Sequence, residues 1–245
     1  MNKDYDWDNY NDCLAAVKEN GYYLKYIKKQ TEEICLEAVK RNGWVLRFVK
    51  EQTPEICLMA IKNWGASLEF VKDQTYKMCI EAVKKNSDSL KYVKEQTEEL
   101  CLTAVRKNGL SLNYVKKEFI TEKLYTEAVK QNGLALQFVK KQTPEMCLIA
   151  VRNDGYALKY VKRQTKKICL EAIKQNIFAI KYVKNKTKEL CSIAVKNNIS
   201  TLKFITKEQT YDLCLEAIKR DSGAIYYIDE IRFSELIDVW RLLYK

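Results

Sequence analysis

The amino-acid sequence predicts an all-α protein, an α-solenoid of ten helix-turn-helix repeats of 22–24 residues with a C-terminal capping helix. Two observations carry this prediction. Cysteine recurs at regular steps, mostly of 22 residues, at positions 13, 35, 57, 79, 101, 147, 169, 191 and 214, and such internal periodicity is typical of stacked repeats. Only seven glycines and two prolines occur in 245 residues, which disfavours a turn-rich all-β fold.

The repeats cover most of the chain, which we treat as a single domain spanning residues 1–245. Tyr125 stands where one cysteine is missing, so the long interval between Cys101 and Cys147 holds two repeats. Two additional residues near 118–121 are expected to bend the stack at its middle. The ten repeats begin near Asn9, Thr31, Thr53, Thr75, Thr97, Thr121, Thr143, Thr165, Thr187 and Thr210.

The first half of each repeat has the signals of a short α-helix. Its first residue is threonine nine times and asparagine once, and both are good N-caps because the side-chain oxygen accepts a hydrogen bond from the first turn. Apolar residues then recur at helical spacing, as in Ile34 and Ala38. An Asn-Gly pair such as Asn42 and Gly43 usually follows, and it predicts a C-cap in the left-handed conformation.

The second half of each repeat predicts a shorter helix that carries an aromatic residue at one constant position. Because neither helix is long enough to be stable alone, each must bury its apolar face against the next repeat. We therefore expect this aromatic column to lie in the core. It consists of Tyr26, Phe48, Phe70, Tyr92, Tyr114, Phe138, Tyr160, Tyr182, Phe204 and Tyr227.

The last segment, residues 233–245, departs from the repeat and predicts one more helix, for which Ser234 is a suitable N-cap. Two interpretations are open. The favoured one is a terminal cap that covers the last layer of the core, and the other is a helix that docks on a partner.

The string T-x-E-[IL]-C-L-x-A-V-K-x-N-G-x-x-L-x-[FY]-V-K runs through the whole chain. It resembles the short, roughly 22-residue helical repeats of an uncharacterised family that is abundant in giant DNA viruses of amoebae, the mimivirus-like group. The resemblance implies a viral protein made in the cytoplasm of a host cell. It implies no catalytic motif and no site residues.

The nine cysteines are expected to be buried thiols that behave as small apolar side chains. Cysteines of neighbouring repeats should lie roughly 8–10 Å apart, the distance between packed helices, whereas a disulfide needs Cα atoms within about 7 Å. A column of cysteines also cannot converge on one zinc ion. Nine unpaired thiols favour a reducing compartment, and we expect the protein in the cytoplasm.

Several classes of function are disfavoured by what the sequence lacks. Histidine is absent, so no imidazole can act as a base or a metal ligand. No Gly-rich phosphate loop, metal motif or nucleophile–base pair is present. No apolar run is long enough for a membrane span, and the acidic N-terminal segment has no apolar stretch typical of a secretory signal. We predict no enzyme, no catalytic residue, no cofactor, no metal and no membrane insertion.

Positive charge is concentrated in the second half of the sequence. The formal net charge is +11, and residues 121–220 hold 20 basic and 9 acidic side chains. The densest cluster spans residues 159–188, and because its members belong to adjacent repeats we expect one continuous basic patch that binds an anionic partner. The candidate binding residues are Lys159, Lys162, Arg163, Lys166, Lys167, Lys181, Lys184, Lys186 and Lys188.

Two columns of basic residues run through the repeats, one on the first helix, which includes Lys174, and one at the end of the second, which includes Lys162 and Lys184. A structural interpretation is favoured for both, because such lysines complement the helix dipole and their stems cover apolar surface.

Three positions before the first column, glutamate alternates with small or apolar residues, which gives a period of two repeats. We favour different packing of odd and even repeats, and contact with a partner or a second copy is the alternative.

Two functions remain. The favoured prediction is a non-enzymatic protein-interaction scaffold with an unknown protein partner, because solenoids offer long binding surfaces. The alternative is sequence-independent nucleic-acid binding through the patch 159–188, because lysine-rich patches pair with phosphates. Base stacking is not expected, since Tyr160 and Tyr182 belong to the aromatic column. A membrane surface could also attract the patch, and a homodimer is compatible with the sequence.

Overall fold

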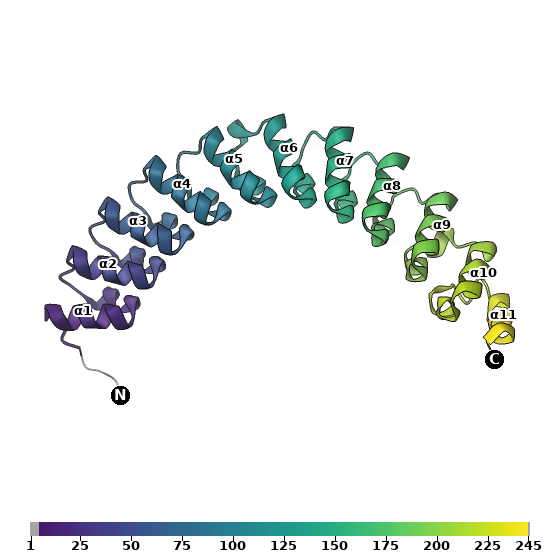
Figure 1. Ribbon diagram of the computed structural model, residues 1–245, viewed down its shortest axis with the longest axis horizontal. Coiled ribbons are helices and arrows are strands. Elements are labelled where there is room, and N and C mark those ends of the chain that lie inside the picture. The colour runs from purple at the N-terminus through teal and green to yellow at the C-terminus, as the bar shows by residue number, and fades with distance from the viewer. Residues whose placement is uncertain (1–4, 245) are drawn as a thin grey trace. The chain divides into compact units, whose positions relative to one another are not determined.

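The computed structural model describes residues 5–244 (Figure 1). Residues 1–4, which begin the acidic N-terminal segment, and residue 245, at the end of the predicted terminal helix, lie outside the described residues. Every regular element from residue 5 to residue 244 is helical, which confirms the all-α prediction. Within this range no helix combines the length and the apolar character that a bilayer crossing requires.

The repeating unit is one α-helix followed by one 3₁₀-helix. The α-helices are α1 (Tyr10–Glu19), α2 (Glu32–Arg41), α3 (Pro54–Asn63), α4 (Tyr76–Lys85), α5 (Glu98–Lys107), α6 (Glu122–Gln131), α7 (Pro144–Asn153), α8 (Lys166–Gln175), α9 (Lys188–Asn197), α10 (Tyr211–Arg220) and α11 (Glu235–Tyr244). The 3₁₀-helices are η1 (Gly21–Tyr26), η2 (Gly43–Phe48), η3 (Gly65–Phe70), η4 (Ser87–Tyr92), η5 (Gly109–Tyr114), η6 (Lys117–Phe119), η7 (Gly133–Phe138), η8 (Gly155–Tyr160), η9 (Ile177–Tyr182), η10 (Ile199–Phe204), η11 (Thr206–Glu208) and η12 (Ser222–Tyr227).

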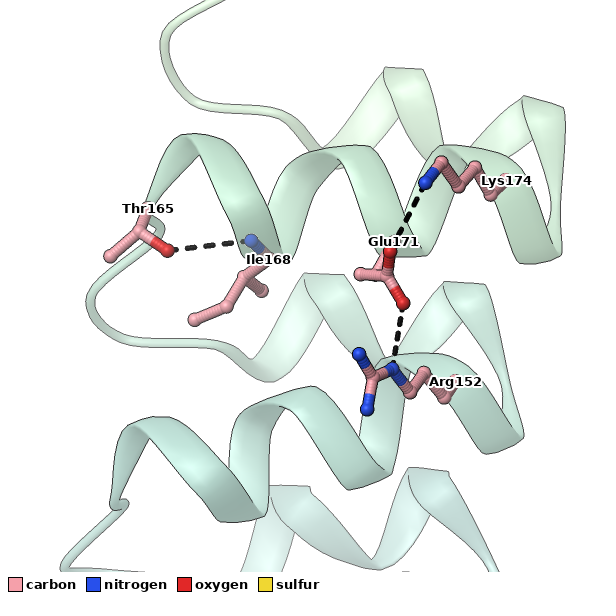
Figure 2. Close-up of polar contacts among 5 residues, drawn as sticks. All are labelled: Arg152, Thr165, Ile168, Glu171 and Lys174. Atoms are coloured by element: carbon pink, nitrogen blue, oxygen red, sulfur yellow. Dashed lines mark hydrogen bonds and ion pairs between the residues drawn. The ribbon is translucent and has the colours of Figure 1, made fainter.

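The predicted N-caps of the ten repeats are confirmed. In α8, the side-chain oxygen of Thr165 accepts a hydrogen bond from the backbone N of Ile168 at 3.3 Å (Figure 2). Asn9 caps α1 in a similar way, through the backbone N of Asn11 and Asp12. The caps satisfy N–H groups that the first turn of a helix leaves without a partner.

The predicted left-handed C-cap is wrong, because no residue from 5 to 244 has a positive φ angle. Asn42 ends α2 in an extended conformation, with φ −151° and ψ 108°, and its side chain accepts a hydrogen bond from the backbone N of Trp44 at 3.0 Å. It therefore caps the 3₁₀-helix that follows. The glycine is needed for another reason, since a Cβ on Gly155 would lie 2.6 Å from the carbonyl oxygen of Ala172 in the next repeat. Glycine lets neighbouring repeats approach closely.

The aromatic column is not part of the core. Tyr26 is 49% exposed and the other nine members are half-buried. The 3₁₀-helix has three residues per turn, so its inward row is formed by residues three apart, such as Leu46 and Val49. Phe48 lies next to that row, at the surface, where Arg47 packs over the ring of Trp44 with 4.2 Å between the guanidinium carbon and the ring centre.

The contacts between Cα atoms divide the chain into two compact units, Met1–Glu127 and Ala128–Lys245, which we call unit 1 and unit 2 and describe separately. In unit 1, each α-helix from α1 to α5 packs against the next, and in unit 2 the same holds from α7 to α10. Each of these α-helices also contacts the 3₁₀-helix of its own repeat. Contact between nearest neighbours alone is the packing pattern of an α-solenoid.

The two additional residues near 118–121 are accommodated by the short helix η6 in unit 1. In unit 2, α11 packs against α10 and η12. Leu236 is buried there, and Trp240 Nε1 donates a hydrogen bond to the carbonyl oxygen of Ser222 at 2.9 Å. The terminal helix therefore covers the end of the last repeat.

Candidate anion-binding surface

The candidate surface lies where the 3₁₀-helices η1–η4 of unit 1 and η7–η9 of unit 2 connect directly to the next α-helix. We use the term loop edge for these connections together with the first turn of the α-helix that follows. The loop edge comprises residues 28–33, 50–55, 72–77 and 94–99 in unit 1 and residues 140–145, 162–167 and 184–189 in unit 2.

A glutamine in the loop edge joins neighbouring repeats. Gln142 Nε2 donates to the carbonyl oxygen of Tyr160 at 2.9 Å, and its Oε1 accepts from the backbone N of Lys162 at 3.0 Å. The buried Cys147 thiol donates to the same Oε1 at 3.7 Å. We call this arrangement the glutamine clamp. The same contacts are made by Gln30, Gln52, Gln74, Gln96, Gln164 and Gln209.

The sequence pattern did not predict the glutamine clamp, because the atoms to which the glutamine bonds are mostly backbone atoms of the next repeat. The available signal was the recurrence of glutamine immediately before the threonine N-cap, as in Gln52 and Thr53. Its consequence for the surface is that the position of each loop is fixed relative to the next.

A lysine ladder reinforces the clamp. Lys162 Nζ donates to the carbonyl oxygen of Lys140 at 2.5 Å, and Lys184 Nζ donates to the carbonyl oxygen of Lys162 at 3.1 Å. Unit 1 has the same contacts between successive members of the ladder Lys28, Lys50, Lys72, Lys94 and Lys116. Two candidate binding residues, Lys162 and Lys184, therefore belong to a framework that both units share.

The structure distributes the other candidate residues over two places. Arg163, Lys166, Lys167, Lys186 and Lys188 lie on the loop edge. The remaining two, on the 3₁₀-helices η8 and η9, are Lys159 and Lys181, whose ammonium groups lie 5.6 and 4.7 Å from the ring centres of the tyrosines next to them.

Open clefts separate successive segments of the loop edge. In unit 2, a cleft of about 320 Å³ is lined by Lys162 and Arg163, and the next, of about 190 Å³, by Lys166 and Lys184. No acidic residue lines either of these two clefts.

Unit 1 repeats this arrangement with acidic linings. A cleft of about 450 Å³ there is lined by Glu32 and Glu51 besides its lysines, and one of about 480 Å³ by Asp73 and Glu95. The clefts are thus a property of the repeat, whereas their charge is a property of the unit.

The charge of the loop edge in unit 2 is only slightly compensated. It holds nine basic and two acidic side chains, a net charge of +7. Lys166 pairs with Glu189 at 2.5 Å. Within the described residues, no hydrogen bond or ion pair engages the side chains of Arg163, Lys167, Lys186 or Lys188. These four charges remain open to a ligand.

The first turn of α8 has an unusual charge for a helix start. It begins with Lys166 and Lys167 and holds no acidic residue, whereas α2 begins with Glu32 and Glu33. Basic side chains at this end oppose the helix dipole. The Thr165 cap still forms, so α8 retains its start without help from the lysines.

Lys174 lies at the other end of α8 and is compensated. Glu171 accepts hydrogen bonds from Arg152 Nε at 2.7 Å and from Lys174 Nζ at 3.3 Å (Figure 2). The hydrogen bond from Arg152, followed by that from Lys174, holds the pKa of Glu171 below its usual range. The same pairing between successive repeats joins Arg106 to Glu127 and Lys196 to Glu216. Three of the alternating glutamates therefore pair with a base of the preceding repeat, while the packing interpretation of the alternation stays a prediction.

The expected burial of the nine cysteines is confirmed. Burial raises the pKa of the Cys191 and Cys214 thiols to about 11. Among residues 5–244, no three side chains of the metal-binding types gather in one place. The thiols of seven of the cysteines donate to the glutamine clamp, namely Cys35, Cys57, Cys79, Cys101, Cys147, Cys169 and Cys214. The thiol of Cys13 donates instead to the carbonyl oxygen of Trp7 at 3.2 Å.

A comparison with protein families matches the chain in overlapping stretches of about two repeats each. The matched residues are 11–53, 31–75, 76–120, 97–143, 121–165, 143–188 and 165–210. No curated protein and no solved structure shows a significant match. Because the matches together run from residue 11 to residue 210, the chain belongs to the family described as a domain of unknown function, DUF4116.

Proposed function

We propose that this chain is a non-enzymatic interaction scaffold that holds an anionic macromolecule, in the first place another protein, along the loop edge of unit 2. The observation that carries the proposal is a pair of adjacent clefts lined by bases without acids. Three further bases of the same edge, Lys167, Lys186 and Lys188, have no partner among the described residues. A surface of one sign attracts partners of the other and speeds their association.

The shared framework supports a binding role for these charges. The glutamine clamp and the lysine ladder hold the loops in both units, so the additional bases of unit 2 are not needed to build the repeat. Lys167 and Lys188 even stand in first turns, where acidic residues are favoured.

Sequence-independent nucleic-acid binding is the second candidate function. Eight of the nine bases on this loop edge are lysines, and lysine acts on phosphates as a point charge without reading bases. Affinity of this kind falls steeply with salt.

We propose a reducing compartment, the cytoplasm, as the place of action. The support is the set of nine buried, unpaired thiols. The resemblance to repeats of giant DNA viruses supports the cytoplasm of an infected host cell.

The test is fluorescence anisotropy of labelled polyglutamate and of labelled single-stranded RNA over a salt series. The variant R163E/K167E/K188E removes open bases from unit 2. The matched control K29E/K77E/K123E reverses three exposed bases of unit 1 and gives the same net charge.

We expect the wild-type chain to bind at low salt, the unit 2 variant to lose about tenfold or more in affinity, and the control to stay within about twofold. Equal losses in both variants would show that only the overall charge matters. If neither polyglutamate nor single-stranded RNA binds at low salt, the proposal is overturned.

A further inference from the structure

Each cleft of unit 2 is suited to one small anionic group. The first offers the side chains of Lys162 and Arg163, and the second those of Lys166 and Lys184. Arg163 has no partner among the described residues, whereas Lys166 pairs with Glu189 and the two ladder lysines each donate to a carbonyl oxygen, so these three ammonium groups reach an anion with their remaining N–H bonds. Thr165 lines both clefts. Its oxygen accepts a hydrogen bond from the backbone of α8, which leaves the hydroxyl hydrogen to donate to an acceptor in a cleft. A carboxylate accepts from all of these groups.

The two clefts follow each other at the step of the repeat. Packed helices lie about 8–10 Å apart, and α7, α8 and α9 pack in series. A polyproline II segment advances about 9.3 Å per turn of three residues and presents every third side chain on one side. A β-strand presents every second side chain on one face, about 6.6 Å apart. The step of the clefts therefore matches the polyproline II spacing and not that of a strand.

The clefts lack what a nucleic acid would use. No aromatic ring lines either of them, whereas single-stranded nucleic acids bind by stacking bases on rings. The rings of Tyr160 and Tyr182 on η8 and η9 are covered by Lys159 and Lys181. A duplex winds its phosphates around its axis, so it does not offer a straight row of charges at this step.

We propose that unit 2 binds an extended acidic segment of another protein in which an acidic side chain occurs at every third residue. Two successive carboxylates occupy the two clefts, and the acids on either side face Lys141 and Lys188. This inference rests on the proposed function and names the chemistry of the partner.

The experiment compares labelled peptides of identical composition, each about twelve residues long, which at about 3.1 Å per residue spans the three segments. One peptide carries glutamate at every third position with proline and serine between. A second carries it at every second position within a block, and a third at every fourth. Single-stranded oligouridine of equal charge is the nucleic-acid probe, and the protein is the full chain.

We expect the peptide with glutamate at every third position to bind about tenfold more tightly than the other two peptides and than the RNA. R163E/K167E/K188E should abolish this preference, and K29E/K77E/K123E should preserve it. Carbodiimide, which joins a carboxylate to a lysine amine, should link this peptide to Lys166 and Lys184.

The other outcomes would overturn the spacing of the acids, the class or place of the partner, or the proposed function. Equal binding of the three peptides, lost in R163E/K167E/K188E, would overturn the spacing while the proposed function stands. Tighter binding of the RNA, or cross-links confined to unit 1, would overturn the class or the place of the partner. No binding by any probe would overturn the proposed function itself.

Discussion

The loop edges of unit 1 and unit 2 are built alike and charged differently. In both units, a glutamine clamp and a lysine ladder hold the segments, as Gln74 and Lys94 do in unit 1 and Gln164 and Lys184 in unit 2. The four segments of unit 1 hold six basic and eight acidic side chains, a net charge of −2. The three segments of unit 2 have a net charge of +7.

This difference separates the residues that build the repeat from those that are free to vary. The second cleft of unit 2 differs from its counterpart in unit 1 mainly in having Lys166 and Asn185 where unit 1 has Tyr76 and Glu95. Glutamine, threonine and cysteine are common to both linings. Since the framework does not require the variable positions, their charge is available for binding.

The largest expected effect is the loss of stability when the glutamine clamp, which both units share, is removed. Gln96→Ala in unit 1 and Gln164→Ala in unit 2 each remove two donated hydrogen bonds and two accepted ones, from the backbone N of a ladder lysine and from a cysteine thiol. Because partly buried backbone groups lose their partners, we expect each variant to lose about 2–4 kcal/mol of unfolding free energy. Urea denaturation measures this loss. Gln137→Ala is the control, since Gln137 bonds only within its own 3₁₀-helix, and losses below about 1 kcal/mol in the clamp variants would contradict a structural role.

The next effect concerns the close approach of repeats in both units. Gly21→Ala and Gly155→Ala would each place a Cβ 2.6 Å from a backbone carbonyl oxygen of the next repeat. We expect each to lose about 1–3 kcal/mol through overpacking. Gly223→Ala is the control, because its Cβ would meet only the side chain of Asp221. A similar cost at all three glycines would indicate a backbone preference instead of contact between repeats.

Local signals in the sequence predicted what depends on one repeat alone. The threonine caps were predicted correctly because a cap such as Thr165 acts on its own helix. The conformation of the Asn-Gly pair was predicted wrongly, because the requirement for Gly155 comes from Ala172 in the next repeat. The aromatic column was placed wrongly in the core because a 3₁₀-helix has three residues per turn instead of about 3.6, which changes the residues that face inward.

The candidate site was predicted only in part, because some of its features depend on contacts with the next repeat. Charge counts located the basic region, but they could not separate the ladder residue Lys162 from Arg163 beside it, because the partner of Lys162 is a carbonyl oxygen of another repeat. The compensation of Lys174 by Glu171, three residues earlier on α8, follows from helical spacing within one repeat and is visible in the sequence. The distinction between Lys162 and Arg163 instead depends on contacts between repeats.

A third prediction transfers the charge of unit 2 to unit 1. D73R/Y76K/E95N gives the unit 1 cleft the variable residues of its unit 2 counterparts, and Glu99 is there to pair with the new lysine as Glu189 pairs with Lys166. In the background R163E/K167E/K188E, we expect the transfer to restore about tenfold of the lost affinity for polyglutamate. Anisotropy at low salt measures the recovery. An unchanged affinity, with the fold intact by circular dichroism, would show that cleft charge alone does not create the site.

The smallest expected effect is the change in stability caused by charged side chains in the first turn of an α-helix. Lys167→Glu places an acid in the first turn of α8, and Glu55→Lys places a base in the first turn of α3. The helix dipole should make the first variant more stable and the second less stable, each by about 0.3–1 kcal/mol at low ionic strength. Urea denaturation in low and high salt measures both, and the two shifts should shrink together as salt screens the charges. If Lys167→Glu gains stability while losing affinity for polyglutamate, the lysine opposes its own helix and serves binding. A loss of both would instead make Lys167 part of the framework, and the division between shared and free positions would fail at that residue.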